Sequence, residues 1–503
     1  SSDLGRYTSG FDKFSNYLLG RDDGITKDAS WAASITGVAA ETITALARRL
    51  PRGRSLITVS HSLQRAQFGE QPVWMGAVLG AMIGQIGLPG GGYHYALGAL
   101  GHTGRRLNAV PIPTMPQGRN GVADFIPVAR IVDMLFNPGE PFDYNGETRR
   151  YPDIKLVYWA GGNPFHHHQD INRLRRAFQV PDTIVVHESA WTPAAKFADI
   201  VLPATMTLER DDIGAAGTDP RLVAMRKVAE PIGEARDDFA IFAELAQRMG
   251  AGDAFTEGRD VRQWLAHLYE PTRKALAEAG RDAPSFEAFW ARGELALPSA
   301  PDDGGFLRAF RNDPDHHRLS TASGRIEIFS ETIAGFDYDD CPGHPAFLAS
   351  TEPASARHPL TLIANQPSTR LHSQLDFGCY SQASKIGGRE AVRLHPTDAA
   401  SRGIADGDIV RLFNDRGACL AGARISDDVM PGVIQLSTGA WYDPAQDGTE
   451  QPLCVHGNPN VLTRDVGTSR LAQGCCGQVT VVECERYDGP LPAIRAFDPP
   501  DIG

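Results

Sequence analysis

Several patterns that would assign the chain to a class directly are missing from the sequence. The seven cysteines are odd in number and show no Cys-x-x-Cys spacing, which argues against a disulfide framework and a zinc or iron–sulfur site. No apolar run approaches the roughly 18–20 residues that span a bilayer. The formal net charge of -12 argues against a general nucleic-acid surface, because phosphate backbones recruit Lys and Arg. Neither a G-x-G-x-x-G fingerprint nor a P-loop occurs.

The composition that remains is that of an ordinary globular protein. Hydrophobic residues make up 42% of the 503 residues and charged residues 22%, so the chain can build sizeable cores. A chain of this length is expected to divide into two to four domains. The mild negative charge mainly predicts solubility.

Strands alternate with helices in the first half of the chain. Such spacing predicts an α/β fold with a doubly wound, parallel, Rossmann-like sheet. The expected strands are 55–59, 154–159, 183–186 and 200–202, and the expected helices are 31–50, 71–83, 127–135, 169–178 and 192–198. Residues 87–120 are rich in Gly and Pro without a period and are expected to form a long loop.

The character of the sequence changes twice after residue 236. Helices are expected over 237–290, and 298–358 looks like a connector with one strand at 325–329. Short strands follow from Leu360, and Asn414 to Gly417 is a predicted hairpin turn, which together favour a β-barrel. The expected domains are 1–178 (α/β dinucleotide-binding lobe), 179–300 (second α/β lobe), 301–358 (connector) and 359–503 (β-barrel).

The loop Gly161-Gly162-Asn163-Pro164 follows a predicted strand and precedes a helix. Glycines let a backbone approach a ligand closely, and a helix amino terminus offers free N–H groups to an anion. Ligands of open α/β sheets bind at this edge. An ordinary strand–helix turn has the same pattern, so the loop alone does not decide between the two.

Polar side chains follow near the same edge. His166, His167 and His168 are consecutive and cannot all point the same way, so one or two of them reaching a phosphate is a better interpretation than a metal site. His187 and Glu188 end the next strand, and Asp212 follows Arg210. An acidic residue at a strand end can hold a ribose or a guanine, although a helix cap or a surface ion pair is an equal alternative.

Two polar clusters lie in the last domain. Arg370, His372, Ser373 and Gln374 fall within five residues after a predicted strand, and His456, Asn458 and Asn460 form the second cluster. Amide side chains both donate and accept hydrogen bonds, which suits the edge of a heterocycle. Ordinary polar loops remain the alternative for each cluster taken alone.

Taken together, these segments resemble the molybdopterin oxidoreductases of the dimethyl sulfoxide reductase family, in the subgroup that reduces S- and N-oxides. The resemblance covers nearly the whole chain in family order. It is carried by residues 10–14, 62–65 with 69–71, 85–91, 159–164, 191–203, 370–374 and 456–474.

The resemblance implies bis(molybdopterin guanine dinucleotide) with molybdenum as cofactor, and a double-psi β-barrel as the last domain. The cofactor contacts that it implies are Gln64, Arg65, Gly161, Gly162, Asn163, His167, His187, Glu188, Asp212, Arg370, His372, Gln374, Asn458 and Asn460. The implied reaction is oxygen-atom transfer from biotin sulfoxide, dimethyl sulfoxide or trimethylamine N-oxide, with an electron donor as partner. No catalytic residue and no metal ligand is assigned.

One departure qualifies this interpretation. The family's serine ligand to molybdenum comes from an amino-terminal region that we do not find before Phe11, so the chain is expected to be the carboxyl-terminal two-thirds of an enzyme. The alternatives are a non-catalytic fragment, one part of a split enzyme, or formate or nitrate chemistry on the same scaffold. The compartment is expected to be bacterial cytoplasm or periplasm, with the cytoplasm favoured by the lack of a disulfide pattern.

Overall fold

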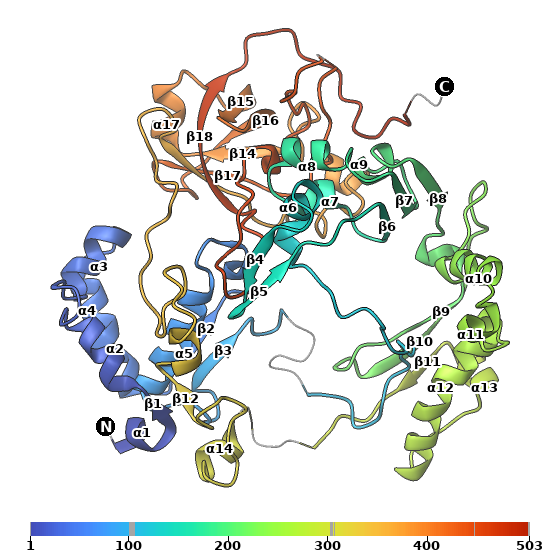
Figure 1. Cartoon of the computed structure of the whole chain (residues 1–503), viewed down its shortest axis with the longest axis horizontal. Coiled ribbons are helices and arrows are strands. Elements are labelled where there is room, and N and C mark those ends of the chain that lie inside the picture. The colour runs from blue at the N-terminus through green and yellow to red at the C-terminus, as the bar shows by residue number, and fades with distance from the viewer. Residues whose placement is uncertain (1, 100–105, 302–304, 306, 447, 501–503) are drawn as a thin grey trace.

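The computed structural model describes residues 2–99, 106–301, 305, 307–446 and 448–500. Figure 1 shows the amino-terminal helices on one side of the molecule and the helices α10 to α13 on the opposite side. The barrel and the parallel sheet lie together between them at the top of this view. Residues that are far apart in sequence therefore meet where the barrel, the sheet and the amino-terminal part approach one another.

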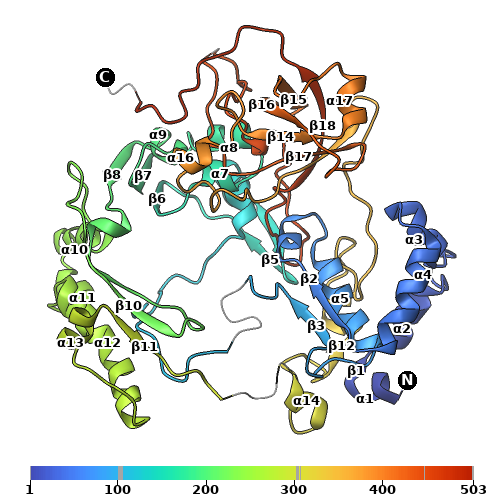
Figure 2. The same cartoon turned by 180° about the vertical axis from the view of Figure 1, so that it is seen from behind.

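The amino-terminal part is built around a small parallel sheet. Strands β2 (Leu56–Val59) and β3 (Gly92–Tyr95) pair in parallel, and helix α5 (Glu70–Met82) connects them and packs against them (Figure 2). The preceding elements are α1 (Ser2–Tyr7), β1 (Thr8–Ser9), α2 (Phe11–Leu18), α3 (Ala29–Thr36) and α4 (Ala40–Arg49).

Two expectations for this part are wrong. The helix expected over 31–50 is two helices, because Gly37 adopts a left-handed φ of 71° and ends α3, as glycine often does after a helix. The long loop expected over 87–120 contains strand β3, which β2 stabilises by pairing and which has no alternating pattern of its own. Residues 100–105 of that expected loop lie outside the described residues.

The parallel sheet next to the barrel follows the predicted order. It consists of β6 (Leu156–Ala160), β7 (Thr183–Glu188) and β8 (Ile200–Pro203), with α7 (Pro164–His167), α8 (Ile171–Ala177) and α9 (Pro193–Lys196) in the connections. The domain boundary expected at 178/179 falls inside this sheet, between α8 and β7. Helix α6 (Ile131–Phe136) and the hairpin of β4 (Pro141–Tyr144) and β5 (Glu147–Arg150) precede it.

A separate lobe carries the helices predicted over 237–290. Its sheet has the order β11-β10-β9, and its core is formed by Leu222, Tyr269, Phe289 and neighbours. The elements are β9 (Asp212–Gly214), β10 (Arg221–Met225), α10 (Asp238–Arg248), α11 (Gly252–Thr256), α12 (Val261–Glu278), α13 (Phe286–Arg292) and β11 (Glu294–Ala296). The connector that follows holds α14 (Arg308–Asn312), β12 (Ile326–Glu327) and α15 (Glu331–Ala334), and β12 pairs with β1.

The last domain is the predicted β-barrel. Its closed order is β13-β17-β14-β16-β15-β18, which mixes parallel and antiparallel pairs as a double-psi-like barrel does. The predicted hairpin joins β15 (Ile409–Asn414) to β16 (Gly417–Ile425). The other elements are β13 (Leu360–Ile363), α16 (Cys379–Gln382), β14 (Ala391–Leu394), α17 (Pro396–Ser401), β17 (Val433–Leu436) and β18 (Val479–Arg486).

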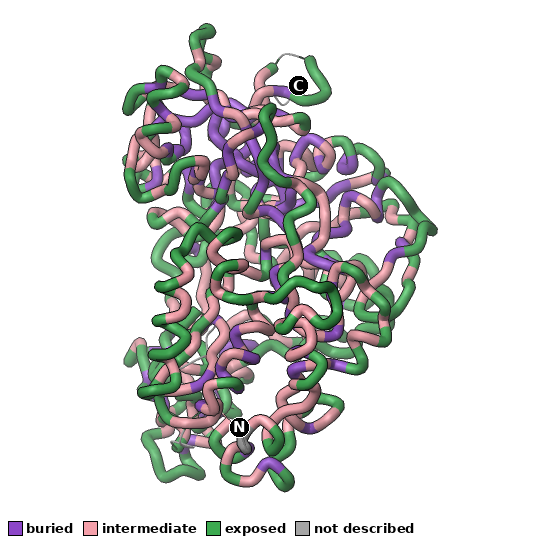
Figure 3. The backbone as a smooth tube through the Cα atoms, turned by 90° about the vertical axis from the view of Figure 1, so that its left-hand side faces the viewer, coloured by how far each residue is buried: buried purple, intermediate pink, exposed green. Residues whose placement is uncertain are grey.

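One hydrophobic core joins the barrel to the parallel sheet. Phe165, Leu174 and Ile184 belong to the same buried cluster as the barrel residues Leu362 and Val410. Figure 3 shows the buried residues concentrated in this half of the molecule, while the amino-terminal end is mostly intermediate or exposed. The relative position of sheet and barrel is therefore set by apolar packing. Among the described residues, no helix combines the length and the apolar character that crossing a membrane requires.

Candidate functional site

The glycine loop presents open backbone at the end of strand β6. Gly161 and Gly162 have φ of 80° and 88°, a region that residues with a side chain rarely adopt. A Cβ atom added at Gly161 would meet nothing within 4 Å, so the glycine is required by backbone conformation and not by crowding within the chain. Asn163 follows as the N-cap of α7, but its side chain makes no cap bond and its buried Oδ1 has no partner among the described residues.

Arg65 approaches this loop from the amino-terminal part. Its side chain is buried, and Nη2 donates to the carbonyl oxygen of His167 at 2.7 Å. Nε and Nη1 are buried as well and have no partner among the described residues. A buried donor without a partner costs about 1–3 kcal/mol, more when it is charged. These donors therefore fit an anionic group at this position.

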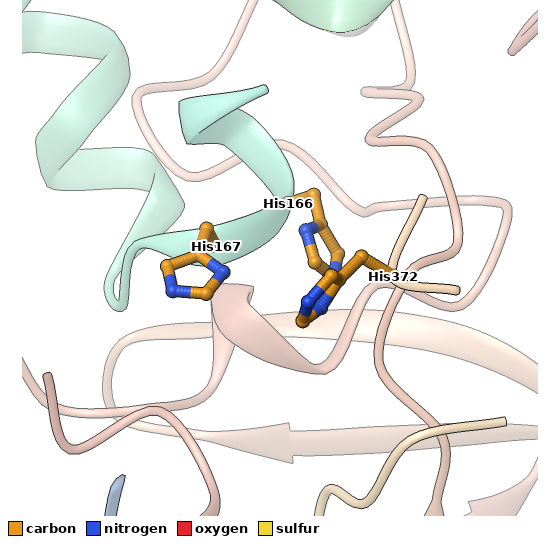
Figure 4. Close-up of side chains that lie close together, drawn as sticks. All are labelled: His166, His167 and His372. Carbon is orange, nitrogen blue, oxygen red and sulfur yellow. The ribbon is translucent and has the colours of Figure 1, made fainter. Parts of the chain in front are cut away.

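Three histidines gather beside Arg65. His166 and His167 come from α7, and His372 comes from the loop after β13 (Figure 4). One ligand nitrogen from each lies within 4.8 Å of the others. The sequence predicted that the consecutive histidines diverge and that one or two of them reach a phosphate. The short helix brings both His166 and His167 toward His372, a proximity that the sequence did not predict.

The electrostatic surroundings favour an anion over a metal ion at these histidines. Burial, with the neighbouring Arg65 and His372, lowers the pKa of His167 to about 4. Burial also lowers the pKa values of His166 and His372, again with Arg65 as a contributing charge. Neutral imidazoles can bind a metal, but the guanidinium that disfavours imidazolium disfavours any other cation as well. Neutral N–H groups beside Arg65 suit a phosphate or a pterin edge.

The predicted amides of the barrel are engaged in holding α7. Asn458 Nδ2 donates to the carbonyl oxygen of Phe165 at 2.8 Å, and Asn460 Nδ2 donates to that of His166 at 2.6 Å. Both side chains are almost fully buried. Their geometry supports a role in positioning the histidine helix against the barrel. A direct cofactor contact of Asn458 or Asn460, which the resemblance implies, stays a prediction.

Arg370 pairs with a carboxylate of the barrel domain, and its predicted cofactor contact stays a prediction. Its side chain is only 1% exposed, and Nη2 lies 2.9 Å from Glu390 Oε2. Lys385 Nζ bridges Asp376 Oδ1 at 2.9 Å and Glu390 Oε2 at 3.0 Å. Burial acts to raise the pKa of Asp376, but Lys385, His456 and Arg370 outweigh it and hold the pKa below its ordinary value. We name Arg370, Asp376, Lys385 and Glu390 the buried ion network.

Two residues of the buried ion network, Arg370 and Asp376, flank His372 in its loop. Asp376 Oδ2 accepts the backbone N–H of Trp441, and Asn163 Nδ2 donates to Ser373 Oγ at 3.4 Å. The network therefore fixes the loop that faces the glycine loop. Sequence reasoning missed Asp376, Lys385 and Glu390, because charged residues spread over 15 positions show no local pattern of partnership.

The remaining predicted residues are distributed over three places. Glu188 ends β7, accepts a hydrogen bond from Thr192 Oγ1, and burial raises its pKa to about 7. His187 points to the other side, where it is bonded to Tyr158 and Asp238. Asp212 lies in another sheet and pairs with Arg210.

Gln64 and Gln374 complete the set of predicted residues. Gln64 lines an apolar cleft next to Arg65, and Gln374 is exposed on the loop after His372. Among the described residues, no hydrogen bond links Gln374, His187 or Asp212 to the glycine loop. For these three residues a cofactor contact stays a prediction.

A parallel α/β sheet packed on a closed barrel, with unpartnered donors converging at their junction, defines a cofactor-binding protein with an anionic ligand. Residues 15–248 match the family described as Molybdopterin oxidoreductase, and residues 360–481 match the Molydopterin dinucleotide binding domain. The chain belongs to the molybdopterin oxidoreductases, and molybdopterin dinucleotide is the cofactor class of its barrel domain.

The relatives narrow the family further. The chain is 50% identical over 501 residues to a biotin sulfoxide reductase of Cereibacter sphaeroides, covering 98% of this chain and 66% of the relative. It is 45% identical to a dimethyl sulfoxide/trimethylamine N-oxide reductase of Rhodobacter capsulatus (99% and 62%) and 44% identical to a trimethylamine-N-oxide reductase of Haemophilus influenzae (99% and 63%).

The chain thus spans about two thirds or slightly less of the length of these curated relatives. The matches lend no support to a missing amino-terminal segment, which stays a prediction. Among solved structures, acetylene hydratase from Pelobacter acetylenicus superposes with a TM-score of 0.66 at 17% identity, covering 97% of this chain and 67% of that one. This likeness confirms the α/β-plus-barrel fold.

Proposed function

We propose that the chain belongs to a molybdenum-dependent reductase that removes the oxygen atom from an S-oxide or N-oxide. The observation that carries the proposal is the convergence of the glycine loop, Arg65 and the His372 loop on one space with buried donors left unpartnered. The named activities of the relatives, biotin sulfoxide, dimethyl sulfoxide and trimethylamine N-oxide reduction, agree with it.

The residues present fit bis(molybdopterin guanine dinucleotide). Arg65 would donate from Nε and Nη1 to its anionic groups, and the open backbone at Gly161 and Gly162 would let a diphosphate approach the amino terminus of α7. His167 and His372 would donate N–H bonds as neutral rings. Glu188, at the end of β7, would accept hydrogen bonds from the hydroxyls of a ribose, as acidic residues at this position of a parallel sheet do.

When bound, the molybdenum group would supply two-electron oxygen-atom-transfer chemistry. Overall, one S-oxide or N-oxide, two electrons and two protons give the sulfide or amine and one water. The electrons require an external donor, which is a further partner in the proposal. The protein would contribute binding, orientation and exclusion of water. We propose the bacterial cytoplasm or periplasm as its compartment, with the cytoplasm favoured.

The proposal is tested on purified protein by molybdenum content and by oxidation of reduced viologen with each of the three oxides. We expect molybdenum and guanine nucleotide to co-purify, and turnover with at least one oxide. Full metal loading with no turnover on any of them would overturn the reductase and favour a non-catalytic fragment or part of a split enzyme. Turnover with formate or nitrate alone would favour different chemistry on the same scaffold.

A further inference from the structure

A cleft of about 780 Å³ lies beside the proposed cofactor site. The two are adjacent because Gln64 lines the cleft while the next residue, Arg65, donates a hydrogen bond to His167 at the cofactor site. Gly474 lines it as well, at a point where an added Cβ atom would lie 3.0 Å from the carbonyl oxygen of Gln64. A molecule in the cleft would therefore lie next to the cofactor-binding residues.

One face of helix α5 forms a wall of the cleft. Glu70, Val73, Trp74 and Ala77 follow the i, i+3, i+4, i+7 spacing that places side chains on one side of a helix, and all four line the cleft. Tyr93 and Tyr95 come from the same face of strand β3, two residues apart. The wall is thus apolar and aromatic, with a single carboxylate at its end.

Only one of the two carboxylate oxygens of Glu70 has hydrogen-bond partners among the described residues. Oε1 accepts hydrogen bonds from Thr468 and Ser469, at 2.5 and 2.9 Å. Oε2 is buried and has no partner among the described residues. Glu70 also stands in the first turn of α5, where the helix dipole stabilises negative charge. A buried carboxylate oxygen without a donor is a costly arrangement that a ligand N–H would relieve.

Glu327 adds a second acidic residue to the lining, whereas no lysine or arginine lines the cleft among the described residues. Its Oε1 accepts the backbone N–H of Ser323. Aromatic faces attract cations, most strongly in sites from which water is excluded. The negative charge, the aromatic lining and the unpartnered Glu70 oxygen thus all favour a cationic ligand that can donate a hydrogen bond.

We propose that this cleft binds a protonated amine with an apolar body. The binding does not depend on the proposed reductase function. Anionic ligands would be disfavoured by Glu70 and Glu327. Small neutral oxides would enter the cleft without filling it.

Three probes with one carbon skeleton test the proposal: 3-methylbutylamine, 3-methylbutanol and 3-methylbutanoate, which are cationic, neutral and anionic at pH 7. Calorimetric titration of the wild-type chain is expected to give amine binding at least tenfold tighter than alcohol binding, and the weakest binding for the acid. Equal binding of amine and alcohol, tightest binding of the acid, or no binding of any probe would overturn the proposal. The titration needs no molybdenum, so its failure leaves oxide reduction untouched.

Two variants locate the effect. Glu70→Gln is expected to abolish the preference for the amine while leaving alcohol binding unchanged, and Trp74→Leu is expected to weaken amine binding more than alcohol binding. Glu278→Gln removes the same charge from an exposed position on α12 and should change neither. A preference for the amine that survives in Glu70→Gln would contradict the assignment to this carboxylate. Should Glu70→Gln fail to fold, the probe series on the wild-type chain still decides.

Discussion

At the scale of single residues, alanine variants of two glycines with the same backbone conformation distinguish the effect of backbone strain from the effect of a lost ligand contact. Gly161 and Gly139 have φ of 80° and 85°, and an added Cβ atom would meet nothing within 4 Å at either position. Both alanine variants should lose about 1–2 kcal/mol of stability from the left-handed conformation. Only Gly161 lies at the proposed cofactor site.

We therefore expect Gly161→Ala to lose most of its bound guanine nucleotide, while Gly139→Ala retains it. The measurement is nucleotide released per chain from protein purified under identical conditions, with urea unfolding to compare the two stabilities. Equal retention in both variants would contradict a close approach of the cofactor at Gly161.

Glu188 gives a prediction about pH. Burial raises its pKa from 4.5 to about 7, so between these values the folded chain holds a proton that the unfolded chain has released. The stability contributed by the protonated form is complete below pH 4.5 and is lost as the pH rises through 7. Allowing for partial exposure, we expect a loss of about 1–2 kcal/mol.

Glu188→Gln cannot titrate and should lack this loss. Urea unfolding of both proteins at pH 5 and pH 8 measures it: the variant should gain on the wild type at pH 8 relative to pH 5. Glu278→Gln, exposed on α12, is the matched control and should show no such difference. A stability difference that is independent of pH would show that Glu188 is not protonated in the native chain.

The buried ion network gives a third prediction at this scale. Lys385 has a side chain that is 1% exposed and holds two carboxylates, so Lys385→Met leaves Asp376 and Glu390 with Arg370 alone. Removing one partner from buried charges costs about 3–5 kcal/mol. Lys274→Met on the surface of α12 should cost less than about 0.5 kcal/mol. A loss at Lys385 as small as at Lys274 in urea unfolding would show that the network is not coupled to folding.

At the scale of elements, glycines allow α5 to lie close to the β2–β3 sheet. A Cβ atom at Gly76 would lie 2.6 Å from the ring of Tyr93 and from Val59 Cγ2. Alanine is the better helix former by about 1 kcal/mol, but the clash forces repacking that costs about 1–3 kcal/mol. We expect Gly76→Ala to be destabilised and to bind 3-methylbutylamine more weakly, because the shift of α5 deforms the cleft wall.

Gly5→Ala is the matched control for this helix glycine. It lies within α1, and its added Cβ atom would meet nothing within 4 Å, so it should be neutral or slightly stabilising. The comparison uses thermal unfolding and calorimetric titration on both variants. A Gly76→Ala chain as stable as Gly5→Ala would contradict the close packing of α5 on Tyr93.

The same scale shows where pattern reasoning succeeds. The helices after residue 237 and the hairpin at Asn414 to Gly417 were predictable, because capping residues and turn residues act within a few positions. Strand β3 was not predictable, since its four residues become a strand only by pairing with β2. Gly37 is a signal for a helix end that the sequence contains, but the helical spacing of apolar residues on both sides of it favoured one continuous helix.

At the scale of the whole molecule, two hydrophobic cores predict two steps of unfolding. The barrel and the parallel sheet share one core, whereas the lobe around Tyr269 and Phe289 has its own. We expect Leu362→Ala to lower the free energy of unfolding of the shared core only, by about 2–5 kcal/mol. Tyr269→Ala should lower that of the lobe only, by a similar amount. Calorimetry of both variants measures this, and a single transition that moves equally in both would contradict separate cores.

The sequence by itself determined the classes of structure: a parallel α/β part, a helical part, a β-barrel, and a glycine loop at a strand end. These follow from periodicity, turn chemistry and backbone freedom, which act over short distances along the chain. It also pointed to the family through the order of its segments. Arg65 was named on that resemblance alone, whereas His372 also belonged to a local cluster of polar residues after a predicted strand.

Only the tertiary structure decided which of these residues meet. Arg65 reaches His167 over 102 positions, and Lys385 pairs with Asp376 in the loop that carries His372. Asn458 holds helix α7 and Arg370 pairs with Glu390, and neither partner could be predicted from the sequence. Charge pairing and burial depend on distances in space that a linear pattern does not contain. The cleft wall of Glu70, Trp74 and Tyr93 exists for the same reason, because helix and strand become one surface only when they pack.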